Sequence, residues 1–237
     1  MRVMRAAVRT TYGPPEIVHL SDVPAPEVGP GDVRVAVHAT TVNRTDCGVR
    51  AGHPFFIRAF TGLFRPRATV LGNEFAGVVE SVGPGVTRFS AGDRVFGYSP
   101  RFGAHADLLS ISQDGLVAAV PADLPFEDVA PATEGAHYAL SIIRKAGISR
   151  GQDVLVNGAT GAIGSAAVQL LADLGARVTA VCGAAHAGLV HGLGADRVID
   201  RDEVDFTKDG HQYDVVFDAV GKSSIGRCRP LLKPRGL

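Results

Sequence analysis

The chain has 237 residues, of which 46% are hydrophobic and 20% charged, a mix typical of folded globular proteins rather than disordered ones. Its 24 Lys and Arg residues balance its 24 Asp and Glu residues, and this zero net charge disfavours nucleic-acid binding, which usually requires a basic excess. Three widely spaced cysteines exclude a disulfide framework, and without a long apolar run or a signal-like start we expect a cytoplasmic protein with no membrane partner.

The first half of the sequence is typical of a β domain. Short apolar or alternating runs predict strands over residues 5–10, 17–20, 32–38, 77–82, 93–96 and 116–120. Turn signals rich in Gly and Pro separate them, so we expect a compact barrel-like domain over residues 1–125. Residues 53–68 are aromatic and basic and predict a loop near a site, whose phenylalanines would line an apolar pocket or form a local cluster.

The second half, residues 126–237, alternates strands and helices. Strands are predicted over 153–157, 177–182, 197–200 and 213–220, and helices over 126–146, 162–174, 187–193 and from 221 to 232. This alternation predicts a parallel sheet covered on both faces. Four strands are present where a complete doubly wound dinucleotide domain has six, so we expect a shortened or fragmentary domain.

The turn between the strand 153–157 and the helix 162–174 is similar to a dinucleotide-binding fingerprint, with Ala159 at the place of its first glycine and Gly158 beside it. Gly161 would let the backbone approach a pyrophosphate, and Gly164 would let the helix pack closely on the strand. The N–H groups at the helix start would then face phosphate. The alternative is a plain tight turn. The residues that we expect to bind the cofactor here are Gly158, Ala159, Thr160, Gly161, Ala162, Ile163 and Gly164.

The end of the next strand bears on the choice of cofactor. An acid that binds the ribose 2′-hydroxyl of NAD is expected there, but Cys182 is followed by Gly and Ala. We therefore favour NADPH, with NADH possible, and place Cys182 in the cofactor site. Arg201 is a candidate for the 2′-phosphate, or else a surface arginine. Val220 and Gly221 follow the fourth strand, at the edge where ligands bind, and are expected to contact the cofactor.

Four stretches together carry a resemblance to a known family: residues 42–46, 71–97, 154–164 and 213–221. With them the chain resembles the medium-chain dehydrogenase/reductase superfamily, and within it the zinc-independent quinone oxidoreductase, zeta-crystallin-like branch. The resemblance implies an N-terminal GroES-like β-barrel domain followed by a Rossmann doubly wound parallel sheet, here incomplete. It also implies a homodimer if the full-length pattern of the family holds.

The same resemblance implies the absence of zinc. In zinc-dependent relatives a Cys stands at the place of Asn43, a His at the place of Asn73, and a Cys near Glu134. Among these three residues only the glutamate is a good zinc ligand, and one ligand is too few. We therefore expect no metal.

Without zinc, the resemblance implies hydride transfer from NADPH to an electrophilic acceptor, either a quinone or another activated C=C or C=O. Asn43 is expected near the nicotinamide and the substrate, where it would orient the acceptor. The alternative for Asn43 is an Asx turn after the strand. Tyr138, in a helix between the domains, is the second candidate catalytic residue, and its alternative is an aromatic core position.

Other functions remain open alternatives. An enoyl- or acyl-thioester reductase of the same superfamily would fit if basic residues Arg58, Arg65 and Arg67 bind an anionic carrier. A non-catalytic cofactor-binding protein with a structural or RNA-associated role, or an inactive shortened protein, are further alternatives. The zero net charge counts against a nucleic-acid partner.

Overall fold

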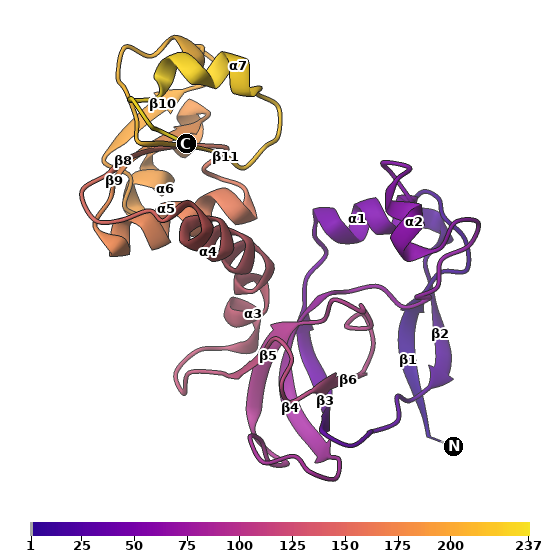
Figure 1. The fold of residues 1–237 in the computed structure, drawn as a ribbon. Helices are drawn as coiled ribbons and strands as arrows, with labels where there is room; N and C mark the ends of the chain where they lie inside the picture. Colours follow the sequence, from indigo (N-terminus) through magenta and orange to yellow (C-terminus); the bar gives the residue numbers. More distant parts are fainter. Residues whose placement is uncertain (1) are drawn as a thin grey trace. The chain divides into compact units, whose positions relative to one another are not determined.

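The computed structural model describes residues 2–237, which form two compact units, residues 2–133 and 134–237 (Figure 1). Each unit has its own hydrophobic core. Among the described residues, no helix combines the length and apolar character that crossing a bilayer would require.

The first unit is built from two antiparallel sheets. One pairs β1 (Val3–Val8) with β2 (His19–Pro24). The other has five strands in the order β6-β3-β4-β5-β7, namely β3 (Asp32–Thr40), β4 (Glu74–Val82), β5 (Arg94–Tyr98), β6 (Leu108–Ser112) and β7 (Val117–Ala119). Single bridges from Ala6 to Ala106 and from Val8 to Val70 join β1 to the chain around the second sheet. The predicted barrel-like β domain is thus present, and its core includes alternate residues such as Val33 and Val35.

Residues 2–125 of the first unit also contain helices, although no helix range was predicted there. They are α1 (Arg44–Ala51) and α2 (Ile57–Thr61), with a short 3-10 turn η1 (Pro15–Ile17) before β2. This turn is why β2 begins at His19 rather than at the predicted residue 17. The strand β6 was also absent from the prediction.

The single helix predicted over residues 126–146 is wrong. The structure has α3 (Phe126–Val129), a 3-10 turn η2 (Ala130–Ala132) and then α4 (Glu134–Ala146). Pro131 lies at the break, and its ring has no N–H and is incompatible with a helix interior. Phe126, Val129 and Ala130 pack with Ala76 and Val120 of the first unit. The division between the two units therefore falls after Thr133, later than the change of sequence pattern at residue 125.

The second unit is a four-stranded parallel sheet in the order β10-β9-β8-β11, which confirms the predicted parallel arrangement. Its elements after α4 are β8 (Asp153–Asn157), α5 (Ala162–Leu174), β9 (Arg177–Cys182), η3 (Ala184–His186), α6 (Ala187–Gly192), β10 (Arg197–Asp200), η4 (Phe206–Lys208), β11 (Val215–Asp218), α7 (Ile225–Cys228) and η5 (Arg229–Leu231). The helical prediction up to residue 232 reduces to α7 and η5, and the fourth strand is shorter than the predicted range 213–220.

Both faces of this sheet are covered. Helices α4, α5 and α6 pack on one face, and Phe206 of η4 and Leu231 of η5 pack on the other (Figure 1). The outer side of β11 is partly paired with residues near the end of the chain. Tyr213 forms a parallel bridge with Leu232, and the Val216 N–H donates to the Leu237 carbonyl at 2.8 Å.

Candidate functional site

The turn between β8 and α5 builds a cradle of backbone N–H groups. Gly158 has a φ of +84°, a conformation that glycine adopts without strain and that turns the chain sharply away from the sheet. Helix α5 then begins after Gly161 with no side-chain cap. Because the first N–H groups of a helix have no partner within the helix, those that follow Gly161 are available to an anion.

The glycines of this turn have separate physical roles. A Cβ on Gly164 would lie 2.1 Å from the Gly158 carbonyl oxygen, so only glycine lets α5 approach the turn. A Cβ on Gly161 would meet nothing closer than that same oxygen at 3.6 Å, and the φ of Gly161 is an ordinary −77°. Gly161 is therefore not required for the fold and leaves room next to the helix start.

A hollow of about 530 Å³ opens at the carboxyl ends of the parallel strands, where α/β sheets bind their ligands. Three predicted residues, Gly158, Arg201 and Val220, line it. The sequence analysis missed its other charged and hydroxyl side chains, which follow β10 and β11: Asp202, Glu203, Asp205, Lys222, Ser223 and Arg227.

The Cys182 side chain does not line this hollow. Its side chain is fully buried, and burial raises the pKa of its thiol. Its backbone carbonyl accepts the Arg201 N–H at 2.9 Å. Cys182 therefore positions the chain after β10 through its backbone, and a direct contact with a cofactor stays a prediction.

The loop after β11 is held by Asp218. Burial opposes ionisation of this carboxyl, but backbone N–H groups of Ser223, Val220 and Gly221 outweigh burial and lower its pKa. One oxygen also accepts from the Asn157 amide at 3.0 Å, across from β8. This arrangement sets Val220 above Gly158, where an added Cβ would lie 2.3 Å from a Val220 methyl.

The first unit holds the other predicted site residue, Asn43, within a hydrogen-bonded network. Asn43 caps α1, because its Oδ1 accepts the Asp46 N–H at 3.0 Å, and the Asp46 carboxylate accepts the Asn43 N–H in return at 3.2 Å. The Asn43 Nδ2 donates to Asn73 Oδ1 at 2.8 Å and to Glu74 Oε2 at 3.3 Å. The alternative of a local turn is thus realised, with further bonds across to β4.

Glu74 is the centre of this network and is buried. Besides Asn43, the Thr41 hydroxyl donates to one carboxylate oxygen at 2.5 Å and the Thr133 hydroxyl to the other at 2.9 Å. These donors satisfy the hydrogen-bonding capacity of the buried carboxylate. Nothing in the sequence analysis singled out Thr41, Glu74 or Thr133.

Asp46 ties the start of α1 to the segment before β4. Burial raises its pKa, although backbone N–H groups of Asn43 and Gly72 and the nearby His105 act in the opposite direction. The Gly72 N–H donates to Asp46 Oδ1 at 3.0 Å, and His105 Nε2 lies 3.8 Å from Oδ2. The helix start and Asn43 are therefore held from several sides.

The donor set at Asn43 does not fit zinc. Asn43 and Asn73 are amides bonded to each other, and the Glu74 carboxylate already accepts from hydroxyl and amide groups. Zinc is bound by thiolate, imidazole or carboxylate ligands, and these three residues supply only one such group, the Glu74 carboxylate. No group of three potential metal-binding side chains is found among residues 2–237.

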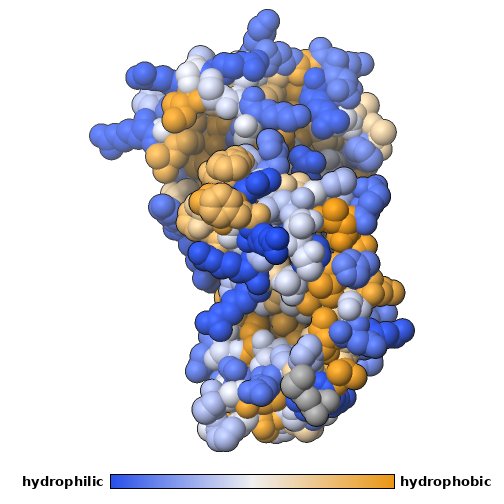
Figure 2. Space-filling view, turned by 90° about the vertical axis from the view of Figure 1, so that its right-hand side faces the viewer, coloured by the Kyte–Doolittle hydropathy of each residue, from blue (hydrophilic) through white to orange (hydrophobic). Residues whose placement is uncertain are grey.

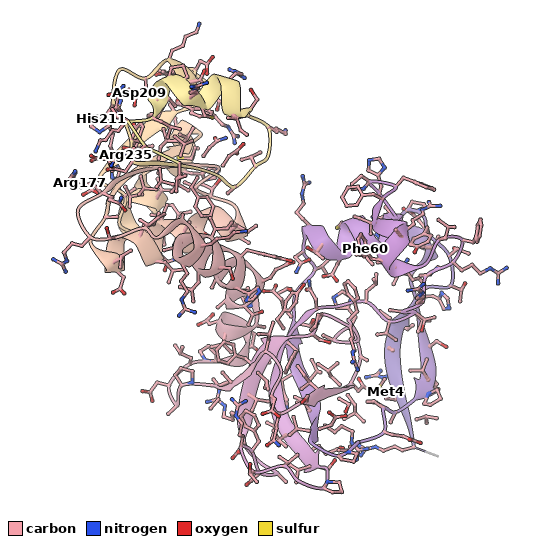
Figure 3. All side chains as sticks on the ribbon, in the orientation of Figure 1. Met4, Phe60, Arg177, Asp209, His211 and Arg235 are labelled. Atoms are coloured by element: carbon pink, nitrogen blue, oxygen red, sulfur yellow. The ribbon has the colours of Figure 1, made fainter. Side chains whose placement is uncertain are left out.

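Tyr138 and the aromatic loop lie outside both clusters. Tyr138 is on α4 in the second unit, is 39% exposed and packs edge-on against His137. Phe60 of α2 is 78% exposed, and Phe55, Phe56 and Phe64 are also exposed, so they form no packed local cluster (Figure 3). Figure 2 shows other hydrophobic side chains that reach the surface between charged ones.

A barrel-like β unit followed by a parallel sheet with an uncapped, glycine-lined helix start is the domain pattern of the medium-chain dehydrogenase/reductase class. Family models agree with this class. Residues 29–121 match the alcohol dehydrogenase GroES-like domain, and residues 162–237 match the zinc-binding dehydrogenase family.

Individual relatives narrow the family. The chain is 33% identical to a 2-haloacrylate reductase from Burkholderia sp. The alignment includes 99% of this chain and 72% of that protein. The chain superposes on the quinone oxidoreductase structure from Coxiella burnetii with a TM-score of 0.88 and 27% identity, over 99% of this chain and 74% of that one. The chain belongs to the medium-chain dehydrogenase/reductase superfamily, in its quinone oxidoreductase-like branch, as its resemblance predicted.

The chain also matches part of a much longer protein. It is 33% identical over 235 residues to a mycoketide-CoA synthase from Mycobacterium tuberculosis. This alignment covers 94% of this chain but 5% of the synthase. The family models and the relatives confirm the family and the predicted fold. The reaction, the acceptor and the individual site residues belong to the proposal below.

Proposed function

We propose that this protein binds NADPH, and NADH as well, in the hollow of the second unit and reduces a quinone or another activated C=C or C=O acceptor without zinc. The observation that carries the proposal is the uncapped start of α5 beside Gly158 and Gly161. Three N–H groups and the positive end of a helix with 13 residues favour a pyrophosphate there.

The fit of the cofactor rests on space at the helix start. Gly161 leaves its side of the helix start open. Arg201, Lys222 and Arg227 line the hollow and are balanced by three acids, of which Asp205 accepts from Arg227 at 2.9 Å. The bound cofactor would supply a hydride from its nicotinamide ring. The chain supplies the N–H groups of residues 162–164 to the phosphates and the loop at Val220 and Gly221 to the cofactor's side.

Asn43 is proposed to orient the acceptor. Its Oδ1 is occupied by the cap of α1, and its Nδ2 makes a short bond to Asn73 and a longer one to Glu74. The longer bond, at 3.3 Å, is the one that an acceptor oxygen would replace. Tyr138 is retained as a second catalytic candidate because its exposed hydroxyl can donate a hydrogen bond.

The names of the relatives support the acceptor class. A 2-haloacrylate reductase and a quinone oxidoreductase are both named for conjugated, electron-poor acceptors. Such acceptors take a hydride without a Lewis acid, which agrees with the amide and hydroxyl network at Asn43.

An enoyl- or acyl-thioester is the second candidate acceptor. It is favoured by Arg65 and Arg67, which are exposed beside Phe64 and could bind an anionic carrier. If the thioester is the acceptor, Arg65→Ala with Arg67→Ala should raise its KM and leave that of a neutral quinone unchanged.

The test is a titration of NADPH and then NADH into the purified chain, followed by a panel of acceptors. Binding is read from the fluorescence of the reduced nicotinamide, and turnover from its loss with a benzoquinone, an enone or an enoyl thioester. We expect binding of both cofactors and turnover of the quinone or the enone. A folded sample that binds neither cofactor would overturn the proposal.

We also propose that the protein is cytoplasmic and forms a homodimer. Sedimentation velocity of the purified chain at micromolar concentration tests the oligomeric state, and a single monomeric species would remove the dimer from it.

A further inference from the structure

The turn after β10 brings a carboxylate to the end of β9. Gly183, which follows β9, has no side chain, and a Cβ built on it would lie 3.2 Å from Asp202 Oδ2. The same position would lie 3.9 Å from Arg201 Nη2. The space that a side chain at position 183 would occupy therefore lies next to Asp202 and Arg201, which follow the neighbouring strand β10.

Backbone bonds set this placement. Asp200 pairs with Cys182 in the parallel ladder, and the Arg201 N–H donates to the Cys182 carbonyl at 2.9 Å. The Asp202 N–H in turn donates to Asp200 Oδ1 at 3.0 Å. The two side chains at positions 201 and 202 line the same hollow as Gly158 and Val220.

The acid and the base are only loosely tied to each other. Arg201 Nε lies 3.6 Å from Asp202 Oδ1, and the two side chains are 60% and 72% exposed. An exposed pair of this kind contributes little stability, so either group can turn toward a ligand at small cost.

The two cofactors differ at the ribose 2′ position, and each suits one member of this pair. A 2′-hydroxyl donates a hydrogen bond to a carboxylate, as the acid at the end of the second strand does in NAD-binding sheets. A 2′-phosphate is attracted by a guanidinium and repelled by a carboxylate.

We propose that Asp202 is the residue that recognises the 2′-hydroxyl of NADH, supplied from β10 in place of the acid absent after β9. Because Asp202 suits the 2′-hydroxyl and Arg201 beside it suits the 2′-phosphate, the protein binds both cofactors. The difference between its affinities for NADPH and NADH is therefore smaller than Arg201 alone would give. This inference rests on the proposed function, namely that the cradle at α5 binds a dinucleotide.

The test compares Asp202→Asn with Asp173→Asn, which makes the same change at an exposed position near the end of α5, outside the hollow. Fluorescence titrations of NADH and NADPH give the dissociation constants, and circular dichroism checks the fold. For Asp202→Asn we expect the Kd for NADH to rise roughly tenfold and the Kd for NADPH to fall severalfold. Asp173→Asn should leave the Kd for NADH within about twofold of wild type.

Opposite changes in the two affinities are what a purely structural role of Asp202 would not produce. If Asp202→Asn weakens both cofactors alike, or leaves NADH binding unchanged, the inference is wrong while the cradle stands. If the folded wild-type chain binds neither cofactor, the proposed function fails, and the inference with it.

Discussion

Asn43 makes three side-chain hydrogen bonds at once, which joins a helix cap to the buried Glu74 and Asn73. Its structural and its proposed catalytic roles therefore depend on different atoms of one amide. Oδ1 serves the cap, whereas Nδ2 faces the buried network. A substitution that keeps an oxygen but removes the nitrogen can separate these roles.

Asn43→Ser is the informative change at the residue scale. Serine retains an N-cap oxygen, so we expect a smaller loss of stability than the roughly 1 to 2 kcal/mol expected for Asn43→Ala. Both variants lose the Nδ2 donor and should lose turnover alike if Asn43 orients the acceptor. Urea denaturation and acceptor reduction measure the two effects. Full activity of Asn43→Ser would exclude the catalytic role.

At the scale of one element, the β8–α5 turn carries the case for a nucleotide site. Its glycines lie within a few residues of each other yet answer to different constraints, one to packing and one to open space. The sequence spacing predicted close packing for Gly164 and open space at Gly161. In the structure, an added Cβ would lie 2.1 Å from the Gly158 oxygen at Gly164 and 3.6 Å from it at Gly161.

Gly161→Ala and Gly164→Ala form a matched pair. The Gly161→Ala methyl meets no close atom, so stability should change by less than about 0.5 kcal/mol. The affinity for NADPH should still fall roughly tenfold or more, because the methyl enters the space beside the phosphates. Gly164→Ala should destabilise the fold by a few kcal/mol through overpacking. Thermal melts and NADPH titrations measure both. Unchanged NADPH affinity in Gly161→Ala would remove the phosphate from this turn.

Across the whole molecule, the carboxyl groups with lowered pKa lie mostly in the second unit. They are Asp153, Asp205, Asp209, Asp214 and Asp218, against Glu80 in the first unit. Arg197 donates two hydrogen bonds to Asp209, at 2.6 and 2.9 Å, and the Tyr213 hydroxyl donates a third. Arg197 and these bonds lower the pKa of Asp209 to about 2 although burial opposes this.

Acid should therefore unfold the second unit first. A lowered pKa in the folded state gives stability that is present above the unfolded value near 4 and is lost as the pH falls through the folded value. For Asp209 the loss should amount to about 2 kcal/mol between pH 4 and pH 2. Urea denaturation followed by circular dichroism at pH 4 and pH 2 tests this. Asp209→Asn should show a smaller difference between the two pH values, and an equal difference would contradict the assignment.

Much of the fold was predictable because its signals are local. Alternating runs, glycine turns and the change from strands to a strand–helix pattern depend on residues close in sequence, so they predicted the β domain, the parallel sheet and the start of α5. The break at Pro131 was also a local signal, and the single long helix was predicted in spite of it.

The sequence by itself determined the family and the glycine turn between β8 and α5, since both depend on contiguous residues whose backbone conformation is set by their neighbours. Only the tertiary structure decided which side chains meet. Asp202 reaches Gly183 because β10 pairs with β9 in one register, and Asn43 reaches Glu74 because β3 pairs with β4. Register is set by long-range packing, and a shift of one residue in either pairing would move Asp202 away from Gly183 and Asn43 away from Glu74.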